Sequence, residues 1–195
     1  MTEPEAEKVE LIVAVLDDLV PDPENPRTQT DQGKTRLEKS LEHYGFVNPI
    51  IAYRIRPEDS AYAAKAGLNA PAGALFVVAG HQRVDAARAQ KFEKVPVLVY
   101  PFRSLKEARA YNVADNKLQE MSAWDFPRLK DRLEDLDDGA FDVELTGFSE
   151  AEHKALVSWT YGEEGGHGRK DMDPKAVDEA GVKTTSKCPR CGFEW

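Results

Sequence analysis

The segment Gly80-His81-Gln82-Arg83 combines a flexible glycine with an imidazole and a guanidinium group. It follows the apolar run 75–79, which predicts a buried strand, and precedes an alanine-rich pattern typical of a helix. The start of a helix offers free backbone N–H groups, and Arg83 adds a planar set of donors, so a phosphate-like anion is an expected ligand. Because short glycine motifs are weak evidence, this pattern leaves open that Arg83 is only a solvated residue on a core helix.

The two cysteines form a second candidate site, Cys188 and Cys191, separated by Pro189 and Arg190. In a reducing compartment this spacing suggests metal or redox chemistry, and it resembles one half of a zinc ribbon. Zinc takes four ligands. A zinc site would therefore need His153 or His167, or the same cysteine pair from a second chain, which would make a homodimer. A pair without metal and a redox-active pair remain alternatives.

The composition limits the class of protein. The chain has 195 residues, of which 41% are apolar, as expected for one domain with a core plus appendages. It has no apolar run of roughly 20 residues and no signal-peptide pattern at residues 1–5, so we expect a soluble cytoplasmic protein without a membrane partner. The net charge of -9 argues against general attraction to nucleic acid, although residues 34–39 could form a local basic patch.

Hydrophobic periodicity predicts the elements that would position these residues. Strands are predicted at 11–16, 46–55, 75–79 and 95–100, and helices at about 30–44, after Gly80, at 104–114, from 125 past Leu136, and at 149–159. A proline-rich loop at 21–27 should aim Asn25 and Arg27, and residues 56–73 show no clear period and predict a surface excursion. This order predicts an α+β fold with a small mixed sheet, packed helices and a helical extension.

The same patterns divide the chain into five parts. They are a disordered N-terminus (1–9), a main domain (10–120), an acidic helical extension (121–160), a flexible linker (161–186) and a cysteine-knuckle tail (187–195).

Four ordered motifs carry a family resemblance. They are Asn25-Pro26-Arg27, the helix–glycine–proline element at 40–50, the Gly80–Arg83 segment, and the pair Asp115-Asn116. With strands between them, the region 10–120 resembles the ParB N-terminal domain of the ParB/sulfiredoxin superfamily. The resemblance implies the ParB/sulfiredoxin fold.

The resemblance also implies a nucleoside triphosphate site for CTP or ATP with Mg²⁺. The phosphates would be held by Gly80, His81, Gln82 and Arg83, with His81 and Arg83 as catalytic candidates. The base pocket would be lined by Gly45, Phe46, Val47, Asn48 and Pro49. Asp115 and Asn116 would hold the metal, and one carboxylate with one amide suits Mg²⁺ beside phosphates. Without the resemblance, a helix C-terminal turn is the favoured interpretation of Asp115-Asn116.

The chain departs from the family pattern at the glycine motif. His81 replaces an acidic residue and Gln82 replaces the first arginine, which predicts lower phosphate affinity or another base preference. Sulfiredoxins would carry their reactive cysteine at the position of His81, so sulfinic acid reduction is excluded. A helix-turn-helix is not apparent downstream, because the helices there are short and acidic. The segment 114–149 resembles the extension of mobile-element ParB-like proteins, some fused to or encoded near DNA methyltransferases, so any DNA-modifying partner would be a separate protein.

Three functional hypotheses follow. The first is a Mg²⁺-dependent nucleotide switch with slow hydrolysis, acting in DNA partition, modification or other mobile-element transactions, with DNA contacted locally or indirectly. The second is a ParB-like nuclease or small-molecule kinase in which His81 acts as a general base. The third is a non-catalytic, zinc-dependent adaptor with a degenerate nucleotide pocket.

Overall fold

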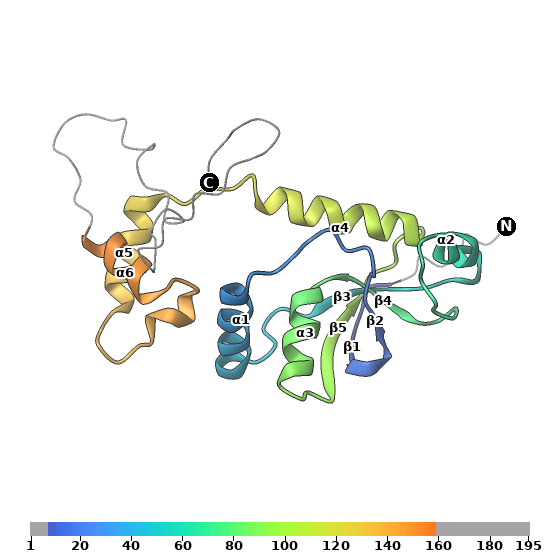
Figure 1. Ribbon diagram of the computed structural model, residues 1–195, viewed down its shortest axis with the longest axis horizontal. Helices are drawn as coiled ribbons and strands as arrows, with labels where there is room; N and C mark the ends of the chain where they lie inside the picture. The colour runs from blue at the N-terminus through green and yellow to red at the C-terminus, as the bar shows by residue number, and fades with distance from the viewer. Residues whose placement is uncertain (1–7, 159–195) are drawn as a thin grey trace. The chain divides into compact units, whose positions relative to one another are not determined.

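The computed structural model describes residues 8–158, which belong to two compact units that divide after Ala123. In the first unit, five strands form one mixed sheet in the order β1-β5-β3-β4-β2 (Figure 1). The strands are β1 (Glu10–Val15), β2 (Leu19–Val20), β3 (Ile50–Arg54), β4 (Leu75–Ala79) and β5 (Lys94–Val99). The helices of this unit are α1 (Asp31–Tyr44), α2 (Ser60–Lys65), α3 (His81–Ala89) and α4 (Leu105–Gln119), with 3-10 turns at Leu16–Asp18 and Pro57–Asp59.

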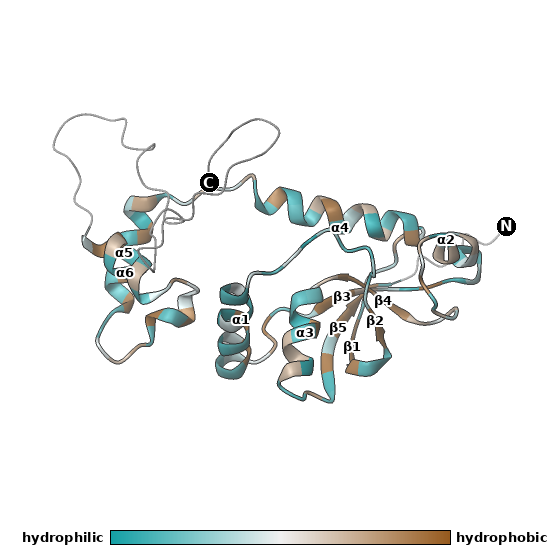
Figure 2. Cartoon of the chain, viewed as in Figure 1, coloured by the Kyte–Doolittle hydropathy of each residue, from teal (hydrophilic) through white to brown (hydrophobic). Residues whose placement is uncertain are grey.

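Helices cover both faces of the sheet. Val84 and Ala87 of α3 join the core on one face, and α1 packs against α3. Leu105 and Ala108 of α4 join Phe76 and the residues of α2 in the core on the other face. Hydrophobic residues accordingly gather in the central strands (Figure 2). The mixed α+β architecture predicted from the sequence is confirmed.

The pairing of the strands places β4, which leads into α3, inside the sheet. β3 runs antiparallel to β4 and parallel to β5, while β1 runs antiparallel to β5. β4 is buried along its whole length and leads directly into α3 through Gly80. The predicted strand–turn–helix unit is therefore present, with its strand paired on both sides, between β3 and the two-residue edge strand β2.

Helix α4 is longer than the sequence pattern predicted. It begins after Ser104, whose hydroxyl accepts a hydrogen bond from the Glu107 N–H at 3.2 Å. It continues to Gln119, so residues 114–118, which were predicted to end the helix, lie within it. Since 115–119 contains neither glycine nor proline, nothing in the local sequence stops the helix. Asp115 and Asn116 thus lie within a helix, and the alternative of a C-terminal turn is wrong.

The predicted surface excursion at 56–73 is also wrong, because part of it is ordered core. Ala63, Ala66 and Leu68 are buried against the α4 side of the sheet. The buried Asp59 accepts hydrogen bonds from the Tyr53 hydroxyl (2.6 Å) and from the backbone N–H of Leu105 (2.9 Å). A six-residue helix is too short to show a clear hydrophobic period, so the sequence pattern missed it.

The second unit, within its described residues, contains α5 (Phe126–Leu136), a 3-10 turn (Val143–Thr146) and α6 (Glu150–Ser158). The two helices pack through Leu129, Leu133 and Leu156. Ser149 and Glu152 form a capping box, with Ser149 N–H donating to Glu152 at 2.7 Å.

Among residues 8–158, no helix has the length and apolar character that a membrane span requires.

Candidate functional site

A cavity of about 340 Å³ in the first unit brings together several segments that are distant in the sequence. The proline-rich loop contributes Asn25 and Arg27, and Leu37 comes from α1. The start of α3 contributes Gly80 to Arg83, and α4 contributes its polar face. With Asn48 from the 40–50 element, all four sequence motifs contribute residues to this one cavity.

Gly80 is required at this position for two reasons. Its φ of +102° is left-handed, which L side chains rarely adopt. A β-carbon here would lie 2.9 Å from Nη2 of Arg83. Gly80 also has no side chain to accept hydrogen bonds from the first amide groups of α3, so these amides are suited to an anionic ligand.

Arg83 folds back over this turn. Its Nη1 donates to the backbone carbonyl of Asn48 at 2.9 Å. Burial lowers its pKa, and the nearby Asp115 carboxylate opposes that shift. The side chain remains a cation, because arginine does not lose its proton in proteins. A partly buried cation beside the start of α3 is suited to phosphate.

His81 has a different role from the one expected of a general base. Its Nε2 accepts a hydrogen bond from the backbone N–H of Asp22 at 3.1 Å. A nitrogen that accepts must be unprotonated, so the ring is neutral with its proton on Nδ1. Burial lowers the pKa of His81, against the opposing effects of Asp22 and Asp85. The lone pair on Nε2 therefore holds the 21–27 loop in place.

This bond predicts a loss of stability in mild acid. The pKa of His81 is lower in the folded than in the unfolded chain, so below the unfolded value of about 6.5 the unfolded state binds the additional proton. The free energy of unfolding should therefore decrease as pH falls below about 6.5. Urea unfolding at pH 7.5 and pH 5.5 would measure the change. The decrease in the free energy of unfolding between these two pH values should be smaller in His81→Gln, whose amide oxygen can still accept the hydrogen bond. An equal decrease in wild type and His81→Gln would contradict the assignment.

A buried ion pair holds the same loop from the other side. The guanidinium of Arg109 donates to Asp22 Oδ2 at 2.9 Å and to Glu24 Oε2 at 2.7 Å. These bonds, with Glu24 the larger influence, raise the pKa of Arg109. Asp22 and Arg109 are 87 residues apart, and each reads as an ordinary charged residue in the sequence. Sequence reasoning missed this pair for that reason.

The polar face of α4 lines the cavity with Asn112, Asp115, Asn116 and Gln119. Asn112 is buried and donates to the carbonyl of Val78 in β4 at 2.7 Å, while Asn116 Nδ2 donates to the carbonyl of Asn112 at 2.8 Å. Sequence reasoning missed Asn112 and Gln119. Their spacing of i, i+3, i+4 and i+7 with the predicted pair was the available signal.

The segment predicted to form a base pocket is only partly at this cavity. Asn48 lines it. Phe46 packs against the core with its ring 5.5 Å from that of Phe92, and Val47 is exposed. Gly45 ends α1 with a φ of +67°. The base-binding role of Gly45 to Pro49 stays a prediction.

The predicted zinc ligands are not brought together in the described residues. Cys188, Cys191 and His167 lie outside them. His153 is buried in the second unit, with its Nε2 3.8 Å from Asp137 Oδ2. Between residues 8 and 158, no group of three or more His, Cys, Asp and Glu side chains could hold a metal ion.

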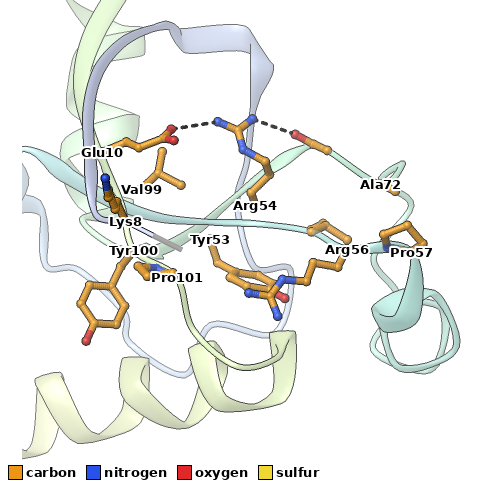
Figure 3. A pocket seen from close by; sticks show the side chains of 12 residues that line it. Lys8, Glu10, Tyr53, Arg54, Arg56, Pro57, Ala72, Val99, Tyr100 and Pro101 are labelled. Carbon is orange, nitrogen blue, oxygen red and sulfur yellow. Dashed lines mark hydrogen bonds and ion pairs between the residues drawn. The ribbon is translucent and has the colours of Figure 1, made fainter. Parts of the chain in front are cut away.

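A second cavity, of about 600 Å³, lies near the start of β1 and is lined by Lys8, Arg54 and Tyr100 among others (Figure 3). Arg54 forms an ion pair with Glu10 at 3.6 Å there, as the dashed line in Figure 3 shows. None of the predicted site residues within 8–158 lines this cavity. The site chemistry is therefore assigned to the cavity beside Gly80.

Comparison with known protein families agrees with this arrangement. The sequence model of the ParB N-terminal domain matches residues 2–116, which is more than half of the chain. The chain belongs to the ParB N-terminal domain family. The ParB-type region includes every residue that lines the cavity beside Gly80 except Gln119.

A second match corrects an expectation. The sequence model of the ParB-methyltransferase HTH domain matches residues 127–188 of this ParB-family chain, which disagrees with the expectation that no helix-turn-helix is apparent downstream of the first domain. That prediction relied on short helices and acidic composition, and surface charge does not determine the fold. Residues 127–158 of the match include α5 and α6.

Two relatives illustrate the likeness. The ParB-like nuclease domain-containing protein YnaK of Escherichia coli (strain K12) is 27% identical over 94 residues, which cover 48% of this chain and 86% of YnaK. Among solved structures, the truncated chromosome-partitioning protein ParB from Caulobacter crescentus, complexed with CTP-gamma-S, has a TM-score of 0.53 and 16% sequence identity. The match covers 76% of this chain and 85% of that protein. This likeness supports the fold of the ParB family.

Proposed function

We propose that the cavity beside Gly80 binds a nucleoside triphosphate, CTP or ATP, together with Mg²⁺. The observation that carries this proposal is the meeting of Arg83, the start of α3, and the Asp115-Asn116 pair at one cavity. Amide groups at a helix start and an arginine are suited to phosphate. A carboxylate and an amide oxygen are suited to Mg²⁺, which takes its remaining ligands from water and phosphate oxygens.

Each residue then has a distinct task. Gly80 and the first amide groups of α3 hold phosphate oxygens, and Arg83 neutralises their charge. Asp115 and Asn116 hold the metal, while His81 and Arg109 keep the 21–27 loop, and with it Asn25 and Arg27, at the cavity. Bound Mg²⁺ would bridge phosphate oxygens and neutralise their charge.

The nucleotide acts as a switch in DNA transactions, with hydrolysis slow. Two observations support this. A relative of similar fold is described in complex with CTP-gamma-S, and the match to a ParB-methyltransferase HTH domain suggests that residues 127–188 contact DNA. The net charge of -9 favours local contact over general attraction. A separate DNA-modifying protein is the partner that this domain name suggests, and the cytoplasm is the expected compartment.

A nuclease is the second candidate, because YnaK is described as containing a ParB-like nuclease domain. In a nuclease of this kind His81 would act as the general base. The hydrogen bond from Asp22 N–H to His81 Nε2 opposes that role, because the nitrogen that would take a proton is already bonded. Nicking of plasmid DNA that disappears in His81→Ala would favour the nuclease.

A nucleotide panel with thermal unfolding tests the proposal. A specific nucleotide with Mg²⁺ should raise the melting temperature by about 5 to 10 °C at about 100 times its dissociation constant. In Asp115→Ala the Mg²⁺-dependent part of the shift should disappear. Asp85→Ala is the matched control, since Asp85 is an exposed carboxylate of α3 that does not line the cavity. No shift with any nucleotide would reject nucleotide binding and leave the adaptor hypothesis.

A further inference from the structure

One edge of the sheet lacks the features that usually protect an edge strand. Among residues 8–158, β1 lies at the end of the strand order and has β5 as its one strand partner. β2 at the opposite edge has only two residues, which is a common form of protection, while β1 has six. From Leu11 to Val15, β1 contains no charged residue and no proline. Such an edge is suited to pairing with another strand.

The side chains of β1 reinforce this interpretation. Ile12 and Ala14 face the core, while Leu11, Val13 and Val15 alternate to the other face. Leu11 is 69% exposed and Val13 is 71% exposed. Leu11 lies opposite Leu98 of β5, so the apolar surface continues into the next strand. A surface strand with three exposed apolar residues in alternation usually has a partner.

The backbone groups at this edge can be assigned from one hydrogen bond. The Leu16 N–H donates to the carbonyl of Glu93 at 2.9 Å, next to the β1–β5 ladder. Because these groups alternate along an antiparallel strand, Ile12 and Ala14 also bond toward β5. The N–H and C=O groups of Leu11, Val13 and Val15 therefore point to the open edge.

We propose that β1 pairs in antiparallel fashion with β1 of a second copy of this chain, with Val13 at the two-fold axis. This register places Val13 opposite the partner subunit's Val13 and Leu11 opposite the partner subunit's Val15. The outward backbone groups of these residues then form the ladder, and their side chains make apolar cross-strand pairs. Two five-stranded sheets become one continuous sheet.

Charge complementarity favours a second copy of this chain as the partner of the β1 edge. The strand is flanked by Lys8 before it and by Asp17 and Asp18 after it, all exposed. In the antiparallel register centred on Val13, Lys8 of each copy lies at the end of the paired strands where the partner's 3-10 turn Leu16–Asp18 begins, so a lysine meets the acidic end of the partner's strand on both sides of the axis. Glu10 adds no repulsion between copies, because Arg54 of the same chain holds its carboxylate at 3.6 Å (Figure 3). The pairing is isologous, as two-fold dimers require.

Sedimentation velocity of the full chain tests the proposal. A short strand pair buries little area, so we expect a dimer that dissociates between about 1 and 100 µM. Val13→Pro removes an outward N–H without removing a bond to β5, and it should weaken association by about tenfold or more. Val13→Thr keeps the shape and the N–H and should still dimerise. A monomer at all concentrations, or a dimer unaffected by Val13→Pro, would overturn the proposal.

Charge reversal provides a second test that does not alter the strand. Lys8→Glu should weaken the dimer, and so should Asp18→Lys. The chain carrying both changes should recover dimerisation, because each reversed charge again meets its opposite across the axis. If the double variant stays as weak as the single ones, the register is wrong. This inference is independent of the proposed nucleotide site, since no residue of β1 lines that cavity.

Discussion

Replacing Arg83 by alanine is expected to reduce the affinity for nucleotide with Mg²⁺ by about 10- to 100-fold. Charge-assisted hydrogen bonds contribute about 1.5 to 3 kcal/mol, and each 1.4 kcal/mol corresponds to a tenfold change. Arg83 lies beside the start of α3 and close to Asp115, where phosphates and metal would meet. Isothermal titration calorimetry with CTP and ATP measures the change.

The matched control is Arg88→Ala on the same helix. Arg88 is a partly exposed arginine that pairs with Asp85 at 3.8 Å and does not line the cavity, so this variant should bind normally. Arg83→Lys keeps the charge but loses the planar fork, and its affinity should fall between wild type and Arg83→Ala. Equal affinities for wild type and Arg83→Ala would show that the phosphate site is elsewhere.

Asp59→Ala is expected to lower the free energy of unfolding by about 3 kcal/mol or more. The Asp59 carboxylate is buried and accepts from the Tyr53 hydroxyl and from the N–H groups of Arg56 and Leu105. Removing it leaves these buried donors without their acceptor, and each unsatisfied group costs about 1 to 3 kcal/mol. Chemical denaturation measures the loss. Glu58→Ala, at the exposed neighbouring position, should have little effect.

The same carboxylate predicts a second, more acidic transition. Burial alone would raise the pKa of Asp59, but the hydrogen bonds from Tyr53 and from the two backbone amides hold its pKa below the ordinary value. A carboxyl whose folded pKa is lowered stabilises the fold above its unfolded pKa, and this stabilisation is lost as pH falls through the folded pKa. Below about pH 4, the free energy of unfolding of Asp59→Asn should depend less on pH than that of wild type.

The sequence predicted the central unit of the fold well, because each of its signals is local. The apolar run before Gly80 and the alanines after it specify a strand and a helix, and a left-handed glycine joins them. The order of motifs then predicted the meeting of Arg83 with Asp115 and Asn116. Their roles toward a nucleotide stay predictions.

What the sequence did not predict depends on contacts between distant residues. The bond between Arg109 and Asp22 and the bond between Asn112 and β4 depend on the final packing of α4. Helix α2 was missed because its six residues are stabilised by tertiary contacts and not by their own periodicity. The match to an HTH domain model was not expected because acidic composition was read as evidence about fold.

The buried amide of Asn112 also limits how α4 can move. Its bond to the Val78 carbonyl fixes the rotation of the helix about its own axis, and the Asp59 bond to Leu105 N–H fixes its first turn. A ligand that pulls on Asp115 cannot roll the helix without breaking a buried hydrogen bond, which costs about 1 to 3 kcal/mol. The segment from Asn116 to Gln119 has no such anchor to the sheet among the described residues. Helix α4 is therefore fixed to the sheet at Asn112, and the proposed metal ligands Asp115 and Asn116 lie just past this fixed point.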